Sequence, residues 1–343
     1  MPLHAAARVA ATNSRVGQRT VRSSVVAVEC VVPRYRLAIE YAGTRYSGWQ
    51  IQQNARTVQG ELDAAIRTVT GRNDFELYGS GRTDAGVHAI GQVAHLDMAT
   101  TLPPASLVQR VNDVLPADIN VLSAVPVPHR FHARHGAIAR RYVYQIARRR
   151  TAFAKPYVWW VKETLDLDAM RTATAAFVGM KDFQSFAAED DAPRANRPSA
   201  RDAHNGGHRA PREVRGSAPA QGSRSTLVLI DRLEVQTDGD LVLVVIQGSH
   251  FLWKMVRRVV GVLVEIGRGG LTPSAAQALL TSRSDVPAKL TAPASGLFLE
   301  RVFYQGEPLD APVTTPTPLE PAGSAPDRRA PSLVPSTSRT TSV

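Results

Sequence analysis

The chain has 343 residues, 43% of them hydrophobic, and a formal net charge of +11. This length can hold two ordinary domains, and no apolar run approaches the length of a membrane span. The single cysteine, Cys30, excludes a disulfide framework and a cysteine zinc site and indicates a reducing compartment. The excess of positive charge favours a polyanionic partner, nucleic acid before a membrane surface.

Three segments have compositions that do not predict a packed core. Residues 1–33 are rich in Ala, Arg and Ser, which is typical of an organelle transit peptide and equally of a disordered N-terminal extension. Residues 187–225 predict a disordered surface insertion, and residues 306–343 a disordered Pro/Thr/Ser tail. We expect a cytoplasmic protein, with organelle targeting by residues 1–33 as the alternative.

The remaining sequence predicts two α/β blocks, at residues 34–130 and 131–305. In the first block we expect strands at 35–41, 75–78, 92–97 and 119–124, and helices at 57–70 and 104–114. In the second we expect strands at 141–146, 227–235, 241–247 and 298–303, and helices at 166–178, 252–266 and 273–280, with 181–186 closing a helix. The tight turn at 237–240 indicates a hairpin. Together these elements predict an α+β fold with largely antiparallel sheet.

The most informative stretch runs from Tyr78 to Ala89, between two of the predicted strands. It places a carboxylate, Asp84, two residues after a cation, Arg82, in a glycine-rich turn. A loop held between strands is a usual place for a catalytic residue, because a rigid scaffold positions it. The alternative is an Asx-turn in which Asp84 only caps its own backbone. We expect His88 to order this loop.

Other runs contain residue types found at nucleic-acid sites. Residues 41–50 mix aromatic residues, Gly and Arg, as a surface that stacks on bases would, and an ordinary aromatic turn is the alternative. Arginines flank a strand that carries Tyr142 and Tyr144 on one face. The apolar helix expected at 252–266 carries arginines in its first turns, and an arginine on a mostly buried helix usually has a carboxylate partner.

Together these runs resemble the TruA type of the tRNA pseudouridine synthase family, in the family's order from about Arg34 to Tyr304. The matching motifs are Gly81–Ala89, Gly48–Gln50, Asn112–Pro116, Phe131–Arg134, Arg140–Tyr142, Lys181–Phe186, Met255–Arg257 and Gly296–Leu299. The chain departs from the pattern at Ala42, where the family usually has Asp, and at Arg258, where Asn is common.

The resemblance implies a pseudouridine synthase fold, in which two ferredoxin- or RRM-like halves share a largely antiparallel sheet with a central active-site cleft. It implies a homodimer that isomerises uridine to pseudouridine at positions 38, 39 and 40, in the anticodon stem-loop of tRNA. Neither a membrane nor a metal or nucleotide cofactor is expected, and the sequence contains no P-loop and no clustered metal ligands.

The resemblance also implies roles for five residues. Asp84 is the expected catalytic carboxylate, and Arg257 is expected to pair with it and keep it ionised. Tyr142 is expected to stack on the flipped uracil, and Leu297 to pack against it. Arg82 is expected to support base flipping. Whether Asp84 attacks the sugar, attacks the base or removes a sugar proton stays open.

Two functions from other classes compete with this hypothesis. A hydrolytic RNA glycosidase also uses carboxylates, but the sequence shows no second one near Asp84. A non-catalytic RRM-like RNA-binding module would need neither Asp84 nor Arg257 to hold it ionised.

Overall fold

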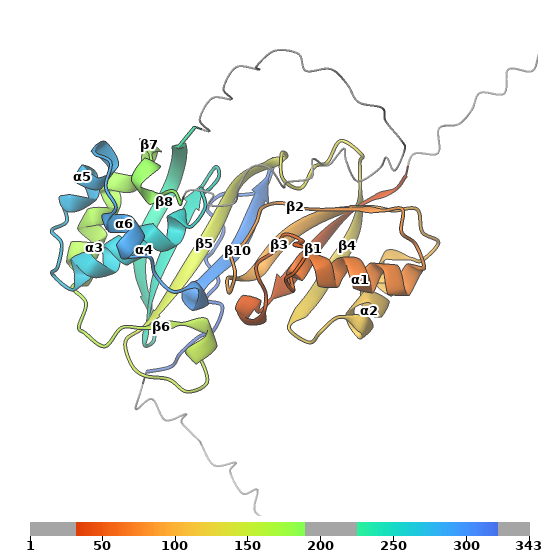
Figure 1. Ribbon diagram of the computed structural model, residues 1–343, viewed down its shortest axis with the longest axis horizontal. Coiled ribbons are helices and arrows are strands. Elements are labelled where there is room, and N and C mark those ends of the chain that lie inside the picture. The colour runs from red at the N-terminus through yellow and green to blue at the C-terminus, as the bar shows by residue number, and fades with distance from the viewer. Residues whose placement is uncertain (1–31, 189–224, 322–343) are drawn as a thin grey trace, which may run out of the picture. The chain divides into compact units, whose positions relative to one another are not determined.

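The described residues, 32–188 and 225–321, form one ten-stranded sheet with helices in this computed structural model (Figure 1). Most neighbouring strands pair antiparallel, which confirms the predicted α+β class and largely antiparallel sheet. The predictions made for residues 1–33 and 187–225 fall almost wholly on stretches that lie outside the described residues.

The first half of the sheet has the chain order βαββαβ. Its elements are β1 (Arg34–Tyr41), α1 (Val58–Thr70), β2 (Glu76–Gly79), β3 (His88–Asp97), α2 (Pro104–Val114) and β4 (Ile119–Val127). The spatial order β4-β1-β3-β2 is that of a ferredoxin-like unit. Thr57 caps α1 by accepting a hydrogen bond from the Gly60 amide, and Gly71 ends the helix in the left-handed conformation.

The second half repeats this arrangement with additions at its edges. Its six core elements are β5 (Ala137–Ala147), α3 (Leu167–Thr174), β8 (Leu227–Asp238), β9 (Leu241–Gly248), α4 (Met255–Gly267) and β10 (Leu297–Tyr304). Their spatial order is β10-β5-β9-β8. The additions are β6 (Trp159–Trp160) beside β5, β7 (Gly179–Asp182) beside β8, and the short helices α5 (Ala275–Thr281) and α6 (Val286–Lys289).

The chain after α3 differs from the prediction that residues 181–186 close a helix. α3 ends at Thr174, a 3₁₀ turn at Ala175–Phe177 follows, and Val178 is already extended where edge strand β7 begins at Gly179. A single 3₁₀ turn at Gln184–Phe186 follows. The helical conformation therefore ends before residues 181–186 begin.

Parallel pairing of β3 with β10 joins the two halves. Phe298 lies opposite His88, and Leu299 lies opposite Ala89. β2 pairs only with the other end of β3, at residues 94–97, and so leaves the start of β3 to β10. The end of the loop between β2 and β3 is therefore placed directly against the second half.

The helices pack against one face of the sheet and form the main core with it. Along β5, Tyr142, Tyr144 and Ile146 belong to this core, whereas Val143 and Ala147 point to the opposite face. Figure 1 shows α1 and α2 along the first half and α3 to α6 along the second. None of the helices in the described part of the chain is long and apolar enough to span a membrane.

Residues 306–321 cover the opposite face of the second half, so the disorder predicted from residue 306 onwards is wrong for this stretch. The side chain of Arg141, on β5, is fully buried and forms a 2.7 Å ion pair with Glu300. Its guanidinium also donates hydrogen bonds to the carbonyls of Ala311, at 2.7 Å, and Pro312, at 2.9 Å. The segment thus supplies acceptors that a buried cation needs.

Two further contacts hold the same stretch on the sheet. Gln145 donates to the Thr317 hydroxyl at 2.6 Å and accepts from the Thr317 amide at 3.1 Å. Val313 and Leu319 pack on the small apolar cluster of this face. An extended segment of this kind has no periodic pattern, and composition alone therefore mispredicted it. The rest of the predicted tail, residues 322–343, lies outside the described residues.

A pair of truncated chains tests this packing. A chain that ends at Gln305 should be less stable than a chain that ends at Pro321 by about 3 kcal/mol, because two hydrogen bonds to a buried guanidinium are lost. This corresponds to a melting temperature lower by roughly 6–12 °C. Equal melting temperatures, measured by circular dichroism, would show that residues 306–321 do not support the fold.

Candidate active site

Backbone hydrogen bonds fix the loop between β2 and β3 on either side of the Asp84 side chain. The Trp49 amide donates to the carbonyl of Thr83 at 3.1 Å, and the Val87 amide donates to the carbonyl of Asp84 at 3.1 Å. Gly48, with φ of 90°, lies so close that a Cβ there would be 2.5 Å from the Thr83 carbonyl oxygen. The close approach of these two loops therefore requires a glycine at this position.

Buried aromatic side chains support the loop from below. Tyr41, Tyr46 and Trp49 are at most 4% exposed, and the Tyr41 hydroxyl lies 2.8 Å from the Thr83 hydroxyl. The interpretation of residues 41–50 as a surface that stacks on bases is therefore wrong for these three rings. Their apolar area is buried in the core, where they support the Asp84 loop.

His88 connects the loop to the second half as a neutral ring. Its Nδ1 accepts a hydrogen bond from the Gly43 amide at 3.0 Å, and its ring stacks on Phe298 of β10 with 4.7 Å between centroids. Burial lowers the pKa of His88 to about 4. An uncharged imidazole with these partners orders the junction between the loop and β10.

Asp84 faces a cation from the other half of the molecule. The Nη1 atom of Arg257, on α4, lies 3.8 Å from Oδ2 of Asp84, and the two side chains are 16% and 20% exposed. The Nε atom of Arg257 donates to the carbonyl of Ala292 at 2.7 Å, which orients the guanidinium. The two residues expected to pair are thus brought within ion-pair distance.

Opposing influences set the pKa of Asp84. Burial raises it, because removal from water disfavours the charged form. The positive charges of Arg257 and Lys254 and a hydrogen bond from Trp253 lower it, but the net pKa remains above the ordinary value. The cations therefore offset part of the desolvation cost of an ionised carboxylate in this cleft.

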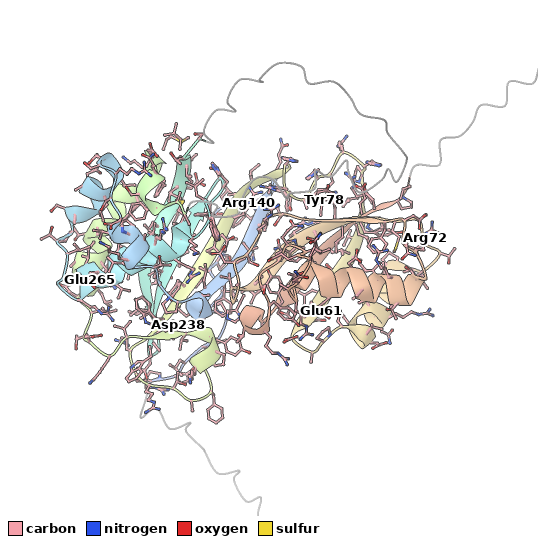
Figure 2. The ribbon with its side chains drawn as sticks, in the orientation of Figure 1. Glu61, Arg72, Tyr78, Arg140, Asp238 and Glu265 are labelled. Atoms are coloured by element: carbon pink, nitrogen blue, oxygen red, sulfur yellow. The ribbon has the colours of Figure 1, made fainter. Side chains whose placement is uncertain are left out.

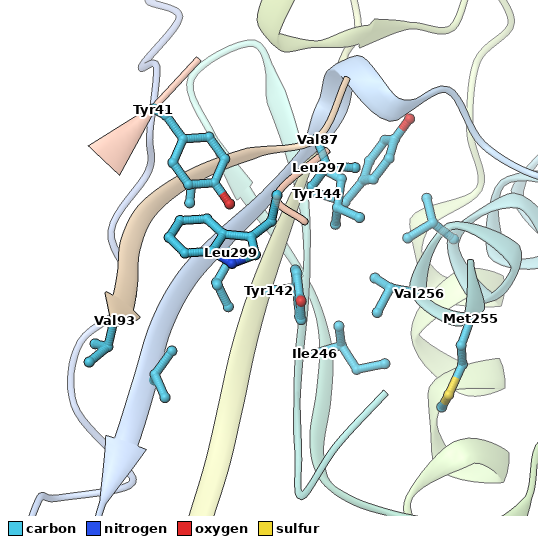
Figure 3. Close-up of a cluster of buried hydrophobic side chains, with 14 of the residues drawn as sticks. Tyr41, Val87, Val93, Tyr142, Tyr144, Ile246, Met255, Val256, Leu297 and Leu299 are labelled. Carbon is cyan, nitrogen blue, oxygen red and sulfur yellow. The ribbon is translucent and has the colours of Figure 1, made fainter. Parts of the chain in front are cut away.

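Tyr142, on β5, is 9% exposed and lies between β9 and β10. Leu299 and Ile246 are its cross-strand neighbours (Figure 3). The ring of Phe251 meets it edge-on, with 5.2 Å between the ring centroids. Burial raises the pKa of the Tyr142 phenol, and the nearby Asp84 carboxylate contributes to the rise. The phenol is therefore protonated at neutral pH and can donate a hydrogen bond.

The other two candidate site residues, Leu297 and Arg82, differ in solvent exposure. Leu297, the first residue of β10, is 4% exposed and lies opposite Tyr144, two residues along β5 from Tyr142 (Figure 3). Arg82 is exposed, and its Nε atom donates to the Gln50 side chain at 3.2 Å. The structure thus brings Asp84 and Arg257 into contact and leaves Arg82 at the surface.

Sequence reasoning missed two features of the site. Trp253 and Lys254, just before α4, both lower the pKa of Asp84. Lys254 has a backbone φ of 59°, which residues other than glycine rarely adopt. Arg140, labelled in Figure 2, bridges the halves by donating to the carbonyls of Ser80 and Ser249. The arginines in these runs were visible in the sequence, but no local pattern reveals a positive φ or a bridge between halves.

Two ferredoxin-like halves that share one sheet, with an acidic loop at their junction, define the pseudouridine synthase fold. The family model for tRNA pseudouridine synthase matches residues 37–135 and 173–305. A tRNA pseudouridine synthase A of Rhodopseudomonas palustris (strain BisA53) is 38% identical, covering 80% of this chain and 100% of the relative. One from Myxococcus xanthus is 37% identical, covering 83% and 96%. The chain belongs to the tRNA pseudouridine synthase family.

The matched residues include most of the candidate site. Asp84 and Arg82 lie in the first matched stretch, and Arg257 and Leu297 in the second, whereas Tyr142 lies in the connection between them. A chain of a solved Cbf5-Nop10-Gar1 complex aligns at 12% sequence identity, and the alignment covers 67% of this chain and 45% of that one. Its TM-score of 0.24 is too low to support a conclusion.

The raised pKa of Asp84 predicts a gain in stability when its charge is removed. A carboxylate whose folded-state pKa exceeds its unfolded value lowers stability as the pH rises through the folded-state pKa. Asp84→Asn should therefore raise the melting temperature at pH 7 by about 2 °C, with a smaller gain at pH 4. The exposed Asp113→Asn, on α2, is the matched control. A lower melting temperature for Asp84→Asn at pH 7 would contradict the net effect of burial.

Proposed function

We propose that this chain converts uridine to pseudouridine at positions 38, 39 and 40 in the anticodon stem-loop of tRNA, with Asp84 as the catalytic carboxylate and without a cofactor. One observation carries the proposal. Asp84, inside the family's Gly81–Ala89 motif, lies 3.8 Å from Arg257 at the junction of the two halves. The net charge of +11 supports a tRNA partner. The proposal includes a homodimer in the cytoplasm.

The chemistry explains why an ionised carboxylate is needed. The reaction breaks the bond between N1 and C1′, turns the base, and joins C5 to C1′. The proton on C5 is lost and N1 gains one, so the overall change is an isomerisation without oxidation or reduction. Asp84 acts as nucleophile at the sugar, as nucleophile at the base, or as the base that removes a sugar proton. Each route requires the anion, which Arg257 and Lys254 favour.

The other candidates have roles that match their positions. The ring of Tyr142 stacks on the uracil, and its phenol, whose pKa is raised partly by the Asp84 charge, relays the C5 proton by accepting it as its own proton passes to a base. Leu297 supplies an apolar surface for the base. Arg82 is an exposed residue of the Asp84 loop. It holds the RNA backbone or occupies the position in the base stack that the flipped base vacates.

One assay separates this function from its two competitors. The protein is incubated with uridine-labelled tRNA, and the nucleosides are analysed after digestion. Pseudouridine supports isomerisation, free uracil indicates a glycosidase, and unchanged RNA that remains bound indicates a binding module. Mapping the product to positions 38, 39 and 40 tests the finer claim.

Asp84→Asn should abolish isomerisation while leaving the Kd for tRNA within about threefold of wild type. The carboxylate takes part in the chemistry, whereas the basic surface supplies most of the binding. Single-turnover assays at saturating enzyme, with Kd from filter binding, measure the two quantities separately. Turnover by homogeneous Asp84→Asn protein would refute the assignment, and the exposed Asp113→Asn is the control.

Arg257→Met should move the acidic limb of the pH–rate profile to higher pH. The substitution retains an apolar stem but removes the positive charge, so the pKa of Asp84 rises further and less anion is present at neutral pH. Arg257→Lys should be milder, because it retains the charge without the guanidinium fork. Arg257→Glu should be inactive at every accessible pH. An acidic limb at the same pH in wild type and Arg257→Met would rule out the proposed pair.

A further inference from the structure

Arg258, which follows Arg257 on α4, carries a charge that no carboxylate in the described part of the chain balances. Its Nη1 atom donates to the carbonyls of Ala187, at 2.5 Å, and Ser185, at 3.4 Å. Its Nε atom is buried without a hydrogen-bond partner there. Burial lowers the pKa of Arg258, and no neighbouring charge among the described residues contributes to the shift. A half-buried guanidinium that has no counter-charge among the described residues is costly, and an anionic ligand beside it would offset that cost.

Arg258 lines a cavity of about 410 Å³ between the turn that follows β7 and the start of α6. The cavity wall includes a further cation, Lys254. It also contains a carboxylate, Asp285, but this group already pairs with Lys289 at 2.7 Å. Positive charge therefore predominates in the wall, and the geometry suits an anionic ligand.

The cavity adjoins the candidate active site. Lys254 and Trp253 line it, and the same two residues act on Asp84. The Lys254 ammonium lies 4.6 Å from the centre of the Trp253 ring, which fixes this cation between the cavity and the carboxylate. An anion in the cavity would thus be a close neighbour of a uridine bound at Asp84.

We propose that this cavity binds a backbone phosphate of the substrate tRNA, next to the uridine held at Asp84, with Arg258 and Lys254 as its main contacts. The inference rests on the proposed function, which supplies RNA as the ligand. A phosphodiester has two anionic oxygens that can accept from a guanidinium and an ammonium together, and it is the anion present beside every nucleotide. The phosphate would supply the negative counter-charge that Arg258 lacks among the described residues.

The first test is the salt dependence of tRNA binding. Arg258→Gln retains a donor for the Ala187 carbonyl but removes the charge. It should weaken binding about tenfold and reduce the slope of log K against log salt by about 1. Arg258→Lys should retain the slope. All variants carry Asp84→Asn so that the RNA stays unmodified during the titration. Lys254→Gln is a second removal of charge from the wall, should Arg258→Gln fail to fold.

The matched control is Arg72→Gln, which also removes one positive charge. Arg72 pairs with Asp74 just after α1, and Figure 2 shows it in the first half, away from α4. This control should leave both the affinity and the slope close to those of the parent. Equal effects of Arg72→Gln and Arg258→Gln would mean that only the overall charge matters, and would overturn the inference.

A neutral methylphosphonate at single linkages of the anticodon arm identifies the phosphate. One linkage should weaken binding of the parent protein about as much as Arg258→Gln does, and the two changes together should cost no more than either alone. If the loss of binding free energy from methylphosphonate at every linkage adds to the loss from Arg258→Gln, the cavity does not hold a phosphate and the proposal fails.

Pseudouridine formation by the unmodified chain distinguishes this inference from the proposed function. Product together with an unchanged slope in Arg258→Gln overturns the cavity assignment alone. A reduced slope without any product retains the cavity as an RNA phosphate site and overturns the isomerisation instead.

Discussion

The short parallel contact between β3 and β10 is the constraint on which the candidate site depends. It pairs only His88 with Phe298 and Ala89 with Leu299, yet it fixes the start of β3 against the second half. The Asp84 loop ends at this point. The contact therefore places a carboxylate from one half across from the first turn of α4 in the other. Neither half alone holds both partners, so the shared sheet creates the site.

The environment of Asp84 combines burial with positive charge. Burial raises its pKa, while Arg257 and Lys254 favour its ionised form. Because these groups are held in place by Ala292 and by the ring of Trp253, they need little reorganisation when RNA binds. The left-handed backbone of Lys254 is a local strain of the kind that occurs at functional sites. Fixed positive charges thus replace part of the hydration shell that stabilises an ionised carboxylate in water.

Local sequence patterns predicted the bounds of the two helices of the first half well. The helix expected at 57–70 begins after its Thr57 cap, and the helix expected at 104–114 has those bounds. The site was predicted through resemblance to a family, because sheet register and not spacing brings Asp84 and Arg257 together. Composition mispredicted residues 306–321 as disordered. This extended segment is held by donors elsewhere in the chain, such as the buried Arg141 guanidinium, and no pattern within the segment reveals them.

The central claim is that Asp84 is a buried carboxylate whose ionisation depends on the charge of Arg257. Carboxyl ¹³C NMR of aspartate-labelled protein measures its pKa directly, with Asp84→Asn identifying the signal. The account predicts that Asp84 titrates above the ordinary value of about 3.9 in wild type, and higher still in Arg257→Met. A pKa at or below the ordinary value, or one that Arg257→Met leaves unchanged, would contradict it.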